Sequence, residues 1–86
     1  MDAKQKARIQ WQEIQDKGHV LGLLEATLAA AGVKCFPQLD TRTETVHITF
    51  LRGGRPEKVI NVAGDSCMAM LVDIFREAGK DLIEES

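Results

Sequence analysis

Four side chains in this sequence are of the types that most often act as nucleophiles, bases or metal ligands: Cys35, Cys67, His19 and His47. They are scattered along the chain, without the paired spacing that a zinc site requires. Nucleophilic catalysis would need a cysteine or serine beside a histidine that an acid orients. The pattern therefore predicts no metal site, no cofactor and no catalytic residues, and we expect a protein that is not an enzyme.

The stretch FLRGGRPEKVINVAGDS, residues 50–66, comes nearest to a phosphate-binding motif. A P-loop requires GxxxxGK[ST] between a strand and a helix, so that backbone amides and a lysine converge on phosphates. GGRPEK lacks this pattern and leads into a strand, which predicts a hairpin turn at Gly53–Gly54. AGDS opens a helix, where we expect Asp65 or Ser66 to cap the free amides in place of a bound anion.

A long helix is predicted at the start of the chain. Its apolar residues recur at helical spacing, namely Ala7, Trp11, Ile14, Leu21, Leu24 and Leu28. Gly32 follows them as a natural left-handed C-terminal cap. Gly18 costs about 1 kcal/mol relative to alanine inside a helix, so two helices that meet at Lys17–Gly18 are the alternative. We favour one helix from about residue 3 to 31, with a weak point at Gly18.

Three strands are predicted next. VKCFPQL contains Pro37, which has no N–H and therefore suits the edge of a sheet. KVINV, residues 58–62, is the third strand. Between them TVHITFL alternates and predicts two faces, one with Val46, Ile48 and Phe50 and the other with His47, Thr49 and Leu51.

The loop between the second and third strands decides which face of the third strand is buried. A two-residue turn at Gly53–Gly54 would leave Ile60 and Val62 on the face opposite Ile48. An odd number of loop residues moves both onto the same face as Ile48, because a one-residue shift flips every side chain. We expect a loop of three or five residues, with the glycines at its positive-φ positions.

The last helix is predicted after Gly64, and Gly79 either ends it or interrupts it. Its apolar residues form one broad stripe that includes Met70, Leu71, Ile74, Phe75, Ala78 and Leu82. The order α-β-β-β-α predicts an α+β fold over residues 1–86, with two helices packed on one face of a three-stranded antiparallel sheet. This fold would separate His47, on the open sheet face, from Cys67, on the helix side.

Composition and charge restrict the class of protein. The chain has 86 residues, enough for one small domain, and its formal net charge is −2. Residues 65–86 carry six acidic and two basic side chains, whereas residues 33–64 are mildly basic. VLGLLEATLAAAG is too short to span a bilayer, and the polar opening is not a secretory signal. We expect a cytoplasmic protein with reduced thiols and no membrane association.

Three surfaces are candidates for protein binding: the Trp11 region, the open sheet face and the basic Gly53–Gly54 hairpin. A helix of about 28 residues spans about 42 Å, more than a three-stranded sheet can cover. Its overhang would expose Trp11 and Ile14 for burial in a homodimer, unless residues 3–17 fold back onto the domain. The open sheet face would display His47, Thr49, Leu51, Val59 and Asn61. We therefore expect a small protein-binding module, an adaptor, inhibitor or regulatory subunit, that also self-associates.

Nucleic-acid binding is the alternative function. The element order is similar to that of double-stranded RNA-binding domains, which place a basic cluster at the start of the last helix. Here that helix opens with GDSCMAMLVD and carries the acidic excess, so no binding residue is transferred from that resemblance. The remaining cations for phosphate contacts lie in or beside the two predicted hairpins: Arg42, Arg52, Arg55 and Lys58.

Overall fold

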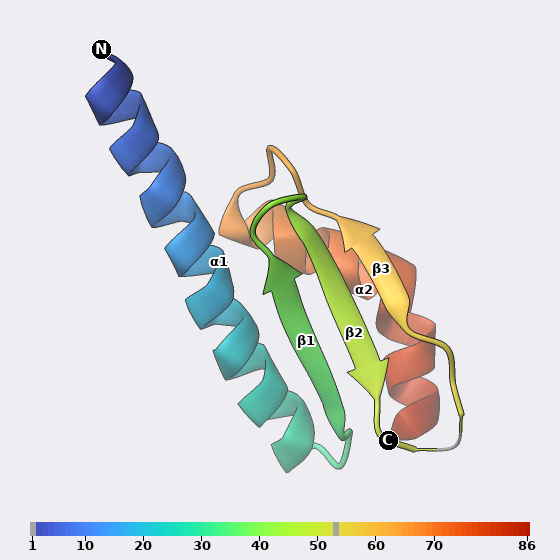
Figure 1. Ribbon diagram of the computed structural model, residues 1–86. Coiled ribbons are helices and arrows are strands. Elements are labelled where there is room, and N and C mark those ends of the chain that lie inside the picture. Colours follow the sequence, from blue (N-terminus) through green and yellow to red (C-terminus); the bar gives the residue numbers. More distant parts are fainter. Residues whose placement is uncertain (1, 53) are drawn as a thin grey trace.

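The five expected elements form an α+β fold. The computed structural model describes residues 2–52 and 54–86. Along the chain its elements are α1 (Ala3–Ala30), β1 (Cys35–Asp40), β2 (Thr45–Phe50), β3 (Lys58–Asn61) and α2 (Cys67–Glu85) (Figure 1). The strands pair antiparallel in the order β1-β2-β3, and their buried side chains join both helices in one core. The predicted fold class is confirmed.

Helix α1 is continuous through Gly18. Asp2 and Gln5 form a capping box at its start, because each side chain accepts a hydrogen bond from the other's backbone N–H, at 2.9 and 3.3 Å. Gly32 follows its C-terminal end with φ of 89°, as predicted. Residues 2–16 are exposed apart from half-buried Ile14, and this part of α1 projects past the sheet (Figure 1). The predicted overhang is therefore present, and the alternative of a fold-back is wrong.

The register of β3 is the one expected for a loop with an odd number of residues. Val46 pairs with Ile60, and both are buried, so Ile60 shares the core face. The loop has seven residues, 51–57, and is longer than the predicted three or five. Val62 N–H donates to the Glu44 carbonyl at 3.0 Å, so every second pair along this ladder is hydrogen-bonded. Beyond the pair Ile48–Lys58, the next hydrogen-bonded pair would be Phe50–Pro56. Pro56 has no N–H to donate, and the ladder therefore ends before it.

The two glycines of this loop were expected at positive φ. Gly54 has φ of 65°, as predicted, and Gly53 lies outside the described residues. At the other end of β2, a turn of residues 41–44 joins it to β1. Glu44 ends this turn with φ of 51°, a conformation in which glycine is more usual.

Pro37 lies on an edge strand, as predicted. Leu51 N–H donates to the Lys34 carbonyl at 3.3 Å, so the alternate residues Phe36 and Gln38 bond to β2. The backbone of Pro37 therefore faces the outer edge of the sheet, where no N–H is needed. The missing donor at this position limits strand addition along the outer edge of β1.

The core lies between the sheet and the two helices. Helix α2 runs through Gly79 to Glu85, and the Ser66 side chain caps its start by accepting from Ala69 N–H at 3.1 Å. The buried apolar side chains are Leu21, Val33, Cys35, Val46, Ile48, Phe50, Ile60, Val62, Met70, Ile74, Ala78 and Leu82. Phe75, which was predicted to belong to the broad apolar stripe of this helix, is half exposed.

Candidate interaction surfaces

An apolar groove of about 780 Å³ opens between α2 and the C-terminal end of α1. We call it the helix groove, and define it by Leu28, Val33, Phe75, Leu82 and Ile83. Phe75 is 50% exposed and Ile83 is 75% exposed. Large apolar side chains gathered on a concave surface are typical of binding sites. This groove was not predicted from the sequence.

Helix α2 has a second apolar face that extends beyond the helix groove. Met68, Val72, Phe75 and Ile83 are exposed and follow one another at spacings of four, three and eight residues, which keeps them near one side of the helix. They flank the buried stripe that faces the sheet. The sequence could have indicated this second face, because the apolar residues of α2 cover a wider arc of the helix than one buried stripe requires.

The open sheet face carries the residues that the sequence placed there. Leu51, Thr49, Val59 and Asn61 are exposed, and His47 is partly buried. The His47 ring is held from both sides, with Nε2 3.0 Å from Thr45 Oγ1 and Nδ1 3.3 Å from Glu57 Oε1. Cys67, by contrast, begins α2 on the helix side of the sheet, which keeps His47 away from it as expected.

Phe36 also lies on the open face, and sequence reasoning did not select it. It is exposed and is the residue that β1 places opposite Thr49. On the other side of β2, Val59 of β3 pairs with His47. The polar side chains of Thr49 and His47 on β2 therefore separate Phe36 on β1 from Val59 on β3. This mixed surface is also what a solvated antiparallel sheet displays.

Trp11 and Ile14 line a second groove, of about 510 Å³, beside the edge strand β1. We call it the edge groove. Its other walls include Gly18 and Gly22 on α1 and Pro37 and Leu39 on β1. Trp11 is 58% exposed at the end of this groove. The predicted site residues thus belong to two separate surfaces, the edge groove and the open sheet face.

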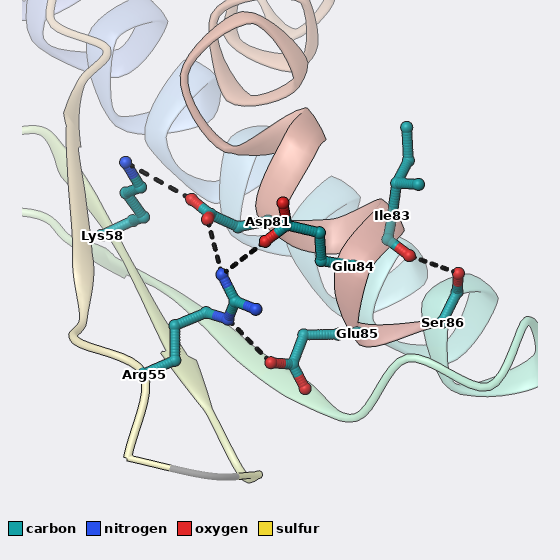
Figure 2. Close-up of polar contacts among 7 residues, drawn as sticks. All are labelled: Arg55, Lys58, Asp81, Ile83, Glu84, Glu85 and Ser86. Carbon is teal, nitrogen blue, oxygen red and sulfur yellow. Dashed lines mark hydrogen bonds and ion pairs between the residues drawn. The ribbon is translucent and has the colours of Figure 1, made fainter.

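Two of the four predicted phosphate-contacting cations are held within the molecule (Figure 2). The Arg55 guanidinium lies 2.8 Å from Asp81, 3.1 Å from Glu84 and 2.7 Å from Glu85. Lys58 Nζ is 3.4 Å from Asp81. These contacts join the β2–β3 loop to the acidic end of α2, and they neutralise much of its charge.

The other two cations lie far apart. Arg42 is in the turn that joins β1 to β2, and Arg52 is in the loop at the opposite end of β2. Both are exposed. The four cations therefore do not form one basic patch, which leaves the nucleic-acid hypothesis with two separated charges at opposite ends of the sheet.

A buried lysine organises the end of the molecule near the start of α2. Lys17 is 2% exposed, and its Nζ donates to the Val62 carbonyl at 2.9 Å and lies 3.7 Å from Glu44. In the ionised form, the buried Asp65 Oδ2 finds no hydrogen-bond donor among the described residues. The hydrogen-bond interaction with Asp73 that protonation permits, then burial and the Asp73 charge, raise the pKa of Asp65, while Lys17 opposes this.

Asp65→Asn is expected to stabilise the protein at neutral pH, by about 1 kcal/mol, because the amide supplies the missing donor toward Asp73. A raised folded-state pKa means that Asp65 favours folding most below its ordinary pKa of 3.8. That contribution is lost as the pH rises through the raised value. Urea unfolding at about pH 7 and about pH 3 should show the gain of Asp65→Asn at the higher pH and its disappearance at the lower.

The control for this prediction is Glu77→Gln, which removes an exposed negative charge from the same helix. A gain of equal size in both variants would mean that net charge, not the Asp65–Asp73 contact, limits stability. A gain at low pH would contradict the direction of the pKa shift.

Comparisons with known proteins found no matching family model, no matching curated protein and no matching solved structure. Within residues 2–52 and 54–86, no group of three or more His, Cys, Asp or Glu side chains is placed to hold a metal ion. In the same residues, neither helix combines the length and apolar character needed to cross a membrane.

Proposed function

We propose that this protein is a small, non-enzymatic protein-binding module, an adaptor, inhibitor or regulatory subunit, that also forms a homodimer. The observation that carries the proposal is the helix groove, where Phe75 and Ile83 are at least half exposed beside the buried residues Val33 and Leu82. Large aromatic and aliphatic side chains of this kind commonly anchor protein contacts when water is excluded from them.

The partner that fits the helix groove best is an amphipathic helix. Its walls are two helices with Phe75, Leu82 and Ile83 on one side and Leu28 on the other, so the floor is apolar along its length. Lys80 and Glu84 lie at the same groove and can contact polar groups at the margin of a bound helix. Helix-in-groove contacts of this type use apolar anchors spaced by three and four residues.

The cysteines support a cytoplasmic location within this proposal. Cys35 and Cys67 are both free thiols, and Cys35 is buried in the core. Burial, and then the negative charges of Glu25 and Glu85, raise the pKa of the Cys35 thiol, which keeps it protonated and unreactive. Unpaired cysteines are typical of proteins in a reducing compartment.

The test is capture of partners from host lysate by the tagged full-length chain, with and without nuclease. Phe75→Glu combined with Ile83→Glu should reduce recovery of a protein partner at least about tenfold, because charge is placed on the apolar floor of the groove. Both side chains are at least half exposed, so the variant is expected to fold. Val59→Glu, an equally exposed apolar residue on the open sheet face, is the matched control.

Each result of this experiment has a distinct meaning. Loss with the groove variant and retention with Val59→Glu supports the helix groove. Loss only with Val59→Glu assigns the contact to the open sheet face instead. Recovery that disappears with nuclease favours nucleic acid, and Arg42→Glu with Arg52→Glu should then weaken it in a salt-dependent manner.

A further inference from the structure

The N-terminal half of α1 has few tertiary contacts that could stabilise it. Residues 3–16 form nearly four turns in which Ile14 is half-buried and the other side chains are exposed, and the first buried side chain of α1 is Lys17. Helices shorter than about 12–15 residues are marginal in water without tertiary packing. The capping box at Asp2 supports only the first turn. A packing partner for the overhang is therefore expected outside the chain.

The edge groove has space for such a partner. Gly18 and Gly22 lie one turn apart on its α1 wall, and a Cβ built at either position meets no atom within 4 Å. Glycine inside a helix is destabilising relative to alanine. Since no contact within residues 2–52 and 54–86 requires glycine at these two positions, the space over Gly18 and Gly22 is available to another molecule.

A helix fits the edge groove better than a strand does. An added strand would need a regular row of donors and acceptors on the outer edge of β1. Pro37 lies in the middle of β1 and lacks the N–H that this row requires. A helix satisfies its own backbone hydrogen bonds, so the proline does not obstruct it.

We propose that the edge groove receives the N-terminal half of α1 from a second copy of this chain, with Trp11 of each copy seated over Gly22 of the other. The two α1 helices then cross antiparallel around a two-fold axis, and the contact is the same on both sides. This inference rests on the self-association included in the proposed function, and it names the surface, the occupant and the geometry.

Charge complementarity supports a second copy as the occupant. Residues 3–12 carry three basic side chains and no acidic one, whereas Glu25 is the one charged residue among residues 18–32. In an antiparallel pair with Trp11 opposite Gly22, the residue three positions before Trp11 lies opposite the residue three positions after Gly22. These two residues are Arg8 and Glu25. Glu25 lines the edge groove itself. The pairing thus places Arg8 of each copy beside Glu25 of the other.

The protein offers a direct probe of this contact, because Trp11 is its single tryptophan. Sedimentation of the full chain over a range of concentrations should show a monomer–dimer equilibrium. Over the same range, Trp11 emission should shift to shorter wavelength, because the indole leaves water on association. Gly22→Leu and Trp11→Ala should each weaken the dimer at least about tenfold.

The variants are chosen so that folding does not confound the result. Gly22→Leu places a good helix former where there is open space, and the single chain is expected to fold. Ile9→Ala is the control for Trp11→Ala, since Ile9 is exposed on the same overhang but does not line the edge groove. It should leave the dimer unchanged.

The decisive experiment exchanges the charges of Arg8 and Glu25. Arg8→Glu alone and Glu25→Arg alone should each weaken the dimer, and the double variant should restore it, because the pair is re-formed with reversed signs. A chain that stays monomeric at every concentration overturns both this inference and the proposed self-association. A dimer that resists Gly22→Leu and Trp11→Ala overturns this geometry alone. Neither result bears on partner capture through the helix groove.

Discussion

Lys17→Ala should lower the free energy of unfolding by about 3 kcal/mol, the largest loss that we expect from any single substitution outside the apolar core. The Lys17 ammonium is buried and donates to the Val62 carbonyl at 2.9 Å. A hydrogen bond to a charged group contributes about 1.5–3 kcal/mol, and the buried methylenes of the side chain add to this. The positive charge also offsets the acidic neighbours Glu44 and Asp65.

Two further variants separate these contributions. Lys17→Met keeps most of the buried stem but removes the charge and its hydrogen bond, so it should cost about 2 kcal/mol, the larger part of the loss. Lys34→Ala removes an exposed lysine and should change stability by less than about 0.5 kcal/mol. Guanidinium unfolding at neutral pH measures all three. If Lys17→Ala proves no more harmful than Lys34→Ala, the buried ammonium does not secure this end of the fold.

Arg55→Ala is expected to lower the midpoint temperature of thermal unfolding by several times the effect of a matched exposed arginine in the same loop. Arg55 contacts three carboxylates at the end of α2, and its guanidinium also lies 5.7 Å from the centre of the Phe50 ring. Among these carboxylates Glu85 is buried, so its charge would lose its closest partner without leaving the interior. Arg55→Lys should rescue only part of the loss, because a single ammonium cannot bind three carboxylates in the same geometry.

Arg52→Ala is the matched control, since Arg52 is an exposed cation in the same loop. It should alter the unfolding midpoint by no more than a few degrees. Combining Arg55→Ala with Glu85→Gln should recover part of the stability, because the unpaired buried charge is removed together with its partner. An equal effect of Arg52→Ala and Arg55→Ala would show that the loop charge, and not the contact with α2, is responsible.

The role of Arg55 also affects how nucleic-acid binding can be tested. A charge reversal at Arg52, Arg55 and Lys58 together would place new acids beside Asp81 and Glu85, and the protein would lose stability whatever it binds. Arg42 and Arg52 are exposed and can be changed without this effect. Lost affinity in variants at these two positions is the interpretable result.

Local patterns were sufficient to predict the elements and the sheet. The helical spacing from Ala7 to Leu28, the left-handed cap at Gly32 and the edge position of Pro37 each follow from geometry within a few residues. The odd parity of the β2–β3 loop also follows, because burial of Ile60 leaves only one choice of register. The faces of His47 and Val59 were predicted for the same reason.

The tertiary structure alone decided which side chains of a helix are covered. Lys17 lies at what the sequence offered as a hinge, yet it is buried, because its Nζ reaches a carbonyl 45 residues away. Phe75 and Ile83 are residue types that are usually found in a core, but they remain exposed because α1 and α2 leave a groove between them. Helical period determines which residues share a face, whereas the burial of that face depends on how distant segments pack against it.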